Sequence, residues 1–374
     1  MSDNGNDVVI CGGGVIGAAV AYYLAKRGVR STLVEANTIA HGASGYAAGF
    51  LSPPKLEHLR SPMAAILEQS YGMHGPLADE LQQDSGIDYR FAWAPSPIVA
   101  CSEEDALDLQ AAATEVEGAR WIEADELHDI SPLIDPGPRG AYLGRPTGQL
   151  DSYLYTRALV AAAERLGSGV RMGRVTGLAG EGDRITGATL AGGETISADA
   201  VVVAMGPWSA EAGPWLGAAV PVVPLKGQIL RLRPNRDLPL AGFTEPGGDY
   251  LMLKSSGLIY TGTTEERAGF DAQPTRAGHD TIRAFGARHA SGLAAMEVVQ
   301  HTACLRPLSP DDRPIIGAVP GRPGAFLATG HGRKGVLMSP ATGAALAELI
   351  VDGQSAALDL APFDPGRFAA EGVT

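Results

Sequence analysis

The sequence contains little cysteine, little lysine and few aromatic residues, and it lacks long apolar runs. Of its 374 residues, three are cysteines, five are lysines and 6% are aromatic. Cys11, Cys101 and Cys304 stand in unrelated settings, so they provide neither a disulfide framework nor the paired spacing of a zinc site. Apolar runs such as residues 200–205 fall far short of the roughly 20 residues that a membrane-spanning helix needs. Residues 1–4 lack the basic start of a secretion signal, so we expect a cytoplasmic protein with no membrane span and no bound metal.

Positive charge is in the minority. The 29 Lys and Arg residues stand against 42 Asp and Glu residues, which gives a net charge of −13. This balance repels phosphate backbones, so we expect no nucleic-acid partner. A length of 374 residues and a hydrophobic share of 45% favour two domains with large cores.

Glycine, by contrast, is abundant: it makes up 49 of the 374 residues, roughly 13%, whereas its usual share is about 7%. The glycines follow no G-x-y period, which excludes collagen, and they lie among Val, Leu, Ile and Ala runs, which excludes a disordered chain. The excess therefore needs a structural reason.

The segment 7–35 has the pattern of a dinucleotide-binding unit. Residues 7–11 predict a buried strand, residues 18–27 a helix, and residues 29–34 a second strand. The motif G-x-G-x-x-G occupies residues 12–17, between the first strand and the helix. Strand, glycine turn, helix and strand in this order predict a βαβ unit that binds a dinucleotide.

Each glycine in this motif has an expected role. We expect Gly12 to make the tight turn, Gly14 to let a pyrophosphate approach the helix N-terminus, and Gly17 to let helix and strand pack closely. Glu35 ends the second strand and would bind a ribose 2′-hydroxyl, which argues against NADP. NAD and FAD both remain compatible with the unit.

A run of small residues at 40–51, A-H-G-A-S-G-Y-A-A-G-F-L, has neither helical nor strand periodicity. Here the chain resembles the D-amino-acid oxidase superfamily of FAD enzymes, most closely its glycine oxidase and sarcosine oxidase branch. In that branch the matching stretch lies along the pyrophosphate and isoalloxazine of FAD, so the resemblance implies FAD rather than NAD. The alternative is a flexible Gly/Ala loop.

Further matches follow in family order over essentially the whole chain. Residues 169–175 resemble the strand that meets the adenine, residues 198–209 the strand and turn that close the FAD domain, and residues 224–228 the crossing into the substrate sheet. Together with the glycine motif, the resemblance implies these cofactor-binding residues: Gly12, Gly14, Val15, Ile16, Gly17, Glu35, Ala36, Gly42, Ala43, Ser44, Ala47, Ala48, Gly49, Val175, Gly206, Trp208, Gly330, His331, Gly332, Arg333, Lys334, Gly335, Val336 and Leu337.

The block 328–338 approaches what the sequence predicts to be a helix N-terminus. Ser339 and Pro340 predict a helix that starts there and stops at Gly353. Reduced flavin is an anion at its N1 to C2 carbonyl edge, so this helix end, helped by Arg333 or Lys334, would stabilise it. The alternative is an ordinary Ser-Pro cap after a mobile loop.

By resemblance, the protein would oxidise amino acids or N-alkyl amino acids by hydride transfer from the α-carbon to flavin N5, giving an imine that water hydrolyses. Arg306 falls where glycine oxidase relatives carry their carboxylate-binding arginine, and Tyr250 matches the tyrosine that offers a hydroxyl to the same carboxylate. Arg306 could instead be an ion-pair partner of Asp311 or Asp312, and Tyr250 could be a core residue.

Several positions depart from the sarcosine oxidase pattern. Ser52 replaces an arginine of the carboxylate clamp, whereas Lys334 keeps its lysine, and Tyr260 falls near the place of the lysine that activates oxygen. Cys304 has the spacing of the cysteine that sarcosine oxidases link to FAD, so it is either a covalent attachment site or a small buried thiol. Glu265 aligns with an apolar pocket residue, and it either faces the substrate or ends a strand in solvent.

The resemblance implies an α/β fold in which a Rossmann-like FAD-binding domain is interleaved with an α+β, antiparallel-sheet substrate domain. The FAD domain would comprise residues 1–85, 145–220 and 300–374, and the substrate domain residues 86–144 and 221–299. The expected partners are an amino-acid substrate and O2 or another electron acceptor, with a homo- or hetero-oligomer left open. The rival functions are the flavin subunit of an amino-acid, proline or opine dehydrogenase, a tRNA-modifying flavoprotein, which the net charge disfavours, and a nicotinamide dehydrogenase.

Overall fold

The dinucleotide-binding unit predicted at residues 7–35 forms the centre of a mixed sheet, and the strand pairs on both sides of it are parallel. In the computed structural model, which describes residues 6–368, β1 (Asn6–Cys11) pairs in parallel with β2 (Ser31–Glu35), and α1 (Val15–Lys26) connects them. The sheet order is β10-β11-β12-β1-β2-β9, with β19 added beside β12 and β18 beside β19. The remaining strands are β9 (Gly169–Met172), β10 (Val175–Glu181), β11 (Arg184–Leu190), β12 (Thr195–Val203), β18 (Ile315–Ala318) and β19 (Ala325–Thr329).

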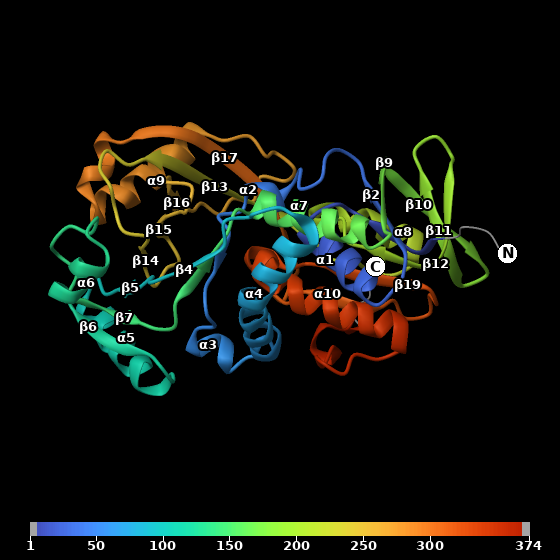
Figure 1. The fold of residues 1–374 in the computed structure, drawn as a ribbon, viewed down its shortest axis with the longest axis horizontal. Helices are drawn as coiled ribbons and strands as arrows, with labels where there is room; N and C mark the ends of the chain where they lie inside the picture. Colours follow the sequence, from blue (N-terminus) through green and yellow to red (C-terminus); the bar gives the residue numbers. More distant parts are fainter. Residues whose placement is uncertain (1–5, 369–374) are drawn as a thin grey trace.

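A second eight-stranded sheet has the order β17-β13-β16-β15-β14-β5-β7-β6 and is antiparallel except between β5 and β14. Figure 1 shows the two sheets toward opposite ends of an elongated molecule. A small sheet of β3 (Phe50–Leu51), β8 (Thr147–Gln149) and β4 (Ala92–Ala94) is separate from both. The strands of the second sheet are β5 (Ile98–Val99), β6 (Arg120–Glu123), β7 (Gly140–Leu143), β13 (Val223–Arg233), β14 (Gly242–Thr244), β15 (Tyr250–Leu253), β16 (Ile259–Gly262) and β17 (Glu297–Leu308).

These two sheets confirm the predicted fold class. The domain boundaries stay a prediction. β17 crosses the boundary placed at residue 300 and pairs with β13 of the second sheet from Val223↔Leu308 to Arg233↔Glu297.

The helices are α1, α2 (Ala43–Tyr46), α3 (Leu56–Leu59), α4 (Ala64–Ser85), α5 (Glu103–Glu115), α6 (Ala124–Ile130), α7 (Ser152–Arg165), α8 (Gly213–Leu216), α9 (Arg276–His289) and α10 (Gly335–Asp352).

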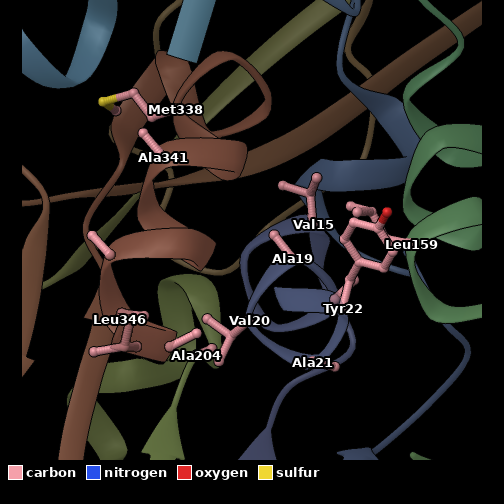
Figure 2. Close-up of a cluster of buried hydrophobic side chains, with 14 of the residues drawn as sticks. Val15, Ala19, Val20, Ala21, Tyr22, Leu159, Ala204, Met338, Ala341 and Leu346 are labelled. Atoms are coloured by element: carbon pink, nitrogen blue, oxygen red, sulfur yellow. The ribbon is translucent and has the colours of Figure 1, made fainter. Parts of the chain in front are cut away.

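The largest core surrounds α1, which packs against α7 and α10. Figure 2 shows Ala19 and Val20 of α1 near α10, and Tyr22 near Leu159 of α7. The backbones of α1 and α10 approach closely, because a Cβ on Gly343 would lie 2.8 Å from the carbonyl of Ala19. Small residues on α1 therefore allow it to be buried between two helices.

Helix α10 begins earlier than the sequence predicts. It starts at Gly335, four residues before Ser339, and Pro340 lies inside it; its end at Gly353 is as predicted. Pro340 cannot donate to the Val336 carbonyl, and the Ser339 hydroxyl donates to that carbonyl instead, at 2.8 Å. Two side chains of α4 bond further α10 backbone groups near Pro340: His74 Nε2 donates to the Leu337 carbonyl at 3.0 Å, and the Ala341 amide donates to Ser70 Oγ.

Two local features have simple causes. Ser102 caps α5 by accepting the amide of Asp105, and the segment 131–138, which contains three prolines, forms neither helix nor strand. Within residues 6–368, one segment, Gly332–Asp352, has the length and hydropathy of a membrane-spanning helix. Most of its residues from 336 to 347 are buried, which is typical of a core helix. Residues 1–4, on which the expectation of no secretion signal is based, lie outside the described residues.

Candidate active site

A cavity of about 1000 Å³ is lined by residues from both large sheets. The carboxyl ends of β1, β2, β12 and β19 border it, as expected for a ligand site of a parallel sheet. Every residue predicted to bind the cofactor lines this cavity except Gly17 and Gly330, and Arg306 and Tyr250 line it as well. The predicted site residues therefore come together from segments more than 300 residues apart.

The first and third glycines of the motif act in packing. Gly12 has a φ of +115°, and a Cβ there would lie 2.4 Å from the Ala204 carbonyl oxygen. A Cβ on Gly17 would lie 2.1 Å from the Gly12 oxygen. Gly14 differs, because its nearest neighbour would be Ser44 Oγ at 3.2 Å and it faces the cavity. Gly12 and Gly17 thus have the turn and packing roles expected from the sequence, and the pyrophosphate-binding role of Gly14 stays a prediction.

Three hydrogen bonds order the part of the cavity beside β1, β2 and α1. Glu35 accepts the amides of Gly13 and Asn37, both at 2.8 Å, so its carboxylate has a defined orientation. The amide of Val15, in the first turn of α1, donates to Ser44 Oγ at 2.8 Å. Ser44 thereby joins the glycine-rich segment to the N-terminus of α1.

Lys254 supports the glycine-rich segment from the second sheet, a role that sequence reasoning missed. Its buried ammonium donates to the carbonyls of Ala48, Gly49 and Leu150 at 2.8, 3.2 and 3.0 Å, and it lies 4.7 Å from the Phe50 ring centroid. Burial lowers the pKa of Lys254 to about 7. The signal in the sequence was a rare lysine directly after the apolar strand 250–253.

The approach to α10 combines cations with a buried imidazole. Burial, together with the charges of Lys55 and Arg333, lowers the pKa of Lys334 to about 8. His331 is buried, its Nε2 lies 3.1 Å from Thr342 Oγ1, and burial lowers its pKa to about 3. Its Nδ1 has no hydrogen-bond partner among residues 6–368. A neutral imidazole and two cations thus border the cavity at the start of α10.

Arg306 is held in place by the loop after β16. Its Nη2 donates to Thr263 Oγ1 at 2.8 Å and its Nη1 to the Thr264 carbonyl at 3.2 Å. The guanidinium passes directly over Gly227 of β13, where a Cβ would lie 2.1 to 2.3 Å from its Nη2, Cζ and Nη1 atoms. Sequence reasoning noted residue 227 only as part of a crossing between domains.

The ion-pair alternatives for Arg306 differ from those weighed on the sequence. Asp311 pairs with Arg313 at 2.7 Å and with Arg367 at 2.9 Å. The ion pair of Arg306 is with Glu265, whose Oε1 lies 3.7 Å from Nη1. The same oxygen contacts Arg333 Nη2. Glu265 is therefore neither simply solvated nor a cavity-lining residue, but a link between two cavity arginines.

Tyr250 lies opposite Gly262 in the β15–β16 pair, and its ring packs edge-on against Phe50 at 4.6 Å. Burial raises the pKa of Tyr250, so its hydroxyl stays protonated as a donor. Cys304 also lines the cavity, and burial raises the pKa of its thiol. An arginine, a neutral phenol and a thiol therefore share one wall, formed by the second sheet.

A parallel sheet with a glycine turn, a helix N-terminus and a carboxylate at its strand ends is typical of dinucleotide-binding enzymes. The cavity suits FAD on three observations: its volume, the open face of Gly14 beside the first turn of α1, and the unpaired Nδ1 of His331. The chain belongs to the DAO family of FAD-dependent oxidoreductases, which matches residues 7–349. This finding confirms the family resemblance, the enzyme class and FAD as the cofactor.

The chain is similar to characterised proteins over nearly its whole length. It is 32% identical to the glycine oxidase of Geobacillus kaustophilus, covering 96% of this chain and 97% of the relative, and 31% identical to that of Pseudomonas aeruginosa, covering 96% and 98%. The crystal structure of the Geobacillus enzyme superimposes with a TM-score of 0.91 over 96% of this chain and 98% of that one. Iminodiacetate oxidase from Chelativorans sp. BNC1 is 25% identical, with a TM-score of 0.87 over 96% and 98%.

Proposed function

We propose that this enzyme oxidises a small amino acid or N-substituted amino acid of the glycine, sarcosine or D-amino-acid type. The observation that carries the proposal is the Arg306 guanidinium, fixed by Thr263 and Thr264 on the cavity wall near Tyr250. A fork of guanidinium donors suits a carboxylate, and the phenol adds a neutral donor. The glycine oxidase relatives support the same substrate class.

FAD, when bound, supplies the hydride acceptor, and the oxidised substrate leaves as an imine that water hydrolyses to an oxo acid and an amine or ammonia. The chain's own task is to hold and orient. Gly14, Ser44 and the first turn of α1 would hold the pyrophosphate, and Glu35 the ribose. Arg333, Lys334 and the start of α10 would stabilise negative charge on the flavin.

On the substrate side, Arg306 and Tyr250 would fix the carboxylate, which leaves the α-carbon hydrogen as the group to be aimed at the flavin. Orientation of this kind lowers the barrier without acid or base catalysis by the protein. The protonated Tyr250 hydroxyl donates to an anion, because its raised pKa excludes a phenolate at neutral pH.

Replacing Arg306 with alanine tests the carboxylate assignment. Loss of a charge-assisted fork costs about 2–5 kcal/mol, so we expect the substrate KM to rise by a factor on the order of 30 or more. Arg233→Ala is a matched control, since Arg233 lies in an exposed ion pair with Glu297 at the far end of the β13–β17 pair. An Arg306→Ala enzyme with an unchanged KM would refute the assignment.

The electron acceptor is the second part of the proposal. Oxygen is the acceptor if hydrogen peroxide forms in step with substrate loss, whereas brisk dye reduction with almost no peroxide identifies a dehydrogenase. Both acceptors should be tested, because Tyr260 stands near the expected place of the oxygen-activating lysine. Lys254 lies 5.4 Å from the Tyr260 ring, but it bonds three carbonyls and does not line the cavity. The cytoplasmic location expected from the sequence stays part of this proposal.

A further inference from the structure

Glu265 contacts two arginines that line the cavity. It follows β16 and contacts Arg333, at the start of α10, and Arg306, on β17, through the same oxygen, Oε1. The Arg306 contact is the longer one, at 3.7 Å. The Arg306 side chain is 12% exposed and the Glu265 side chain 37%, so Glu265 lies at the solvent side of the buried guanidinium.

Most other cations at the cavity have their own carboxylate. Arg145 pairs with Glu68 at 2.6 Å and Arg174 with Glu211 at 2.9 Å, and Arg60 pairs with Glu115. In the part of the chain that the structure describes, no ion pair involves Lys55 or Lys334. Near α10 the lining therefore combines Lys55, Arg333 and Lys334 with the carboxylate of Glu57, whose charge acts on Lys334. Without Glu265 the Arg333 guanidinium would be open to an anion.

We propose that Glu265 sets the charge specificity of the site, admitting amino acids with one carboxylate and rejecting those with a second carboxylate on the side chain or the nitrogen. The inference rests on the proposed function, because it places the first carboxylate on Arg306. A second carboxylate reaching Arg333 must displace Glu265 or lie beside it as a like charge. Specificity then comes from a repulsive group rather than from an added attraction.

Binding of unreactive ether analogues tests the inference without turnover. Methoxyacetate carries one carboxylate, diglycolate carries two, and diglycolic acid monoamide has the size of diglycolate with one charge fewer. Dissociation constants are measured by calorimetry with the FAD-loaded enzyme. The variants are Glu265→Gln, the double variant Glu265→Gln/Arg333→Ala, and the control Glu297→Gln, which makes the same charge change in the exposed pair with Arg233.

In the wild-type enzyme we expect diglycolate to bind at least about tenfold more weakly than its monoamide, since like charges in contact are costly. Glu265→Gln should abolish or reverse this preference, Glu297→Gln should keep it, and the double variant should lose the diglycolate affinity gained by Glu265→Gln. Equal binding of diglycolate and monoamide by the wild type, or an unchanged ratio in Glu265→Gln, would overturn the inference.

The outcome for the proposed function is read separately. Methoxyacetate that binds the wild type and Arg306→Ala equally well contradicts the carboxylate site itself, and the inference falls with it. Methoxyacetate binding that depends on Arg306, combined with no effect at Glu265, contradicts the inference alone.

Discussion

Replacing Gly227 with alanine perturbs the Arg306 site without changing any charged group. The new Cβ would lie 2.1 Å from Arg306 Nη2, whereas ordinary contact begins at 3.4 Å. The guanidinium must therefore move by about 1.3 Å, the difference between these distances. A shift of that size breaks the bonds to Thr263 Oγ1 and the Thr264 carbonyl, now 2.8 and 3.2 Å long.

The fold should survive this change, because the obstacle is the end of a flexible side chain and alanine is compatible with a strand. The arginine keeps its charge, so we expect the low end of the range for a lost fork, about 2 kcal/mol in substrate binding, or a roughly 30-fold rise in Kd. The assay combines calorimetry with methoxyacetate, substrate KM, and a thermal melt to check folding.

Gly72→Ala is the matched control. Gly72 lies in α4, and a Cβ added there would have no neighbouring atom within 4 Å, so alanine only replaces a poor helix former. We expect a wild-type Kd and a Tm equal to or above that of the wild type. Wild-type affinity in a folded Gly227→Ala enzyme would refute the placement of the substrate carboxylate on Arg306.

Two other predictions concern Lys254 and Cys304. Lys254→Met removes the donor to three carbonyls, two of them in buried contacts, and should cost about 3 kcal/mol of unfolding free energy. The pKa of Lys254 in the folded protein, about 7, lies below its ordinary value of 10.5, so the wild type gains stability over the variant as the pH rises above 7, by up to about 1.4 kcal/mol per pH unit. Denaturant unfolding at pH 7 and pH 9, with Lys26→Met as the control, measures this gain. A difference in stability that does not change with pH would contradict it. The raised pKa of the Cys304 thiol disfavours a reactive thiolate, so acid precipitation should release all the yellow colour into the supernatant. A wild-type pellet that stays yellow, together with a colourless pellet from Cys304→Ser, would establish a covalent flavin instead.

The parts of the fold that depend on neighbours in sequence could be predicted. The glycine motif and Glu35 act within one βαβ unit, so their pattern is visible in the chain. The predicted start of α10 was wrong because it depends on contacts with another helix, α4. Ser339 and Pro340 obey the rule for a helix start, but within α10 the Ser339 hydroxyl bonds the Val336 carbonyl, and His74 and Ser70 of α4 bond the neighbouring Leu337 carbonyl and Ala341 amide.

Site residues that lie in a sequence motif could be predicted, whereas contacts that depend on the pairing of distant strands could not. Arg306 stood in a recognisable pattern, whereas its contact with Gly227 depends on the pairing of β13 with β17, strands about 80 residues apart. Lys254 reaches carbonyls about 100 and 200 residues away. Glu265 was open to two interpretations, because its partner Arg333 is distant from it in the sequence.

Amino-acid oxidation by the bound flavin is tested by anaerobic mixing of the purified yellow enzyme with a panel of glycine, sarcosine, D-amino acids, proline and opines. We expect at least one of the small amino acids to bleach the visible flavin bands in the absence of oxygen. We also expect Arg306→Ala to bleach far more slowly with that substrate at low concentration. A flavin that no member of the panel reduces, or an Arg306→Ala variant that bleaches at the wild-type rate, would show that the enzyme does not bind and oxidise its substrate in this way.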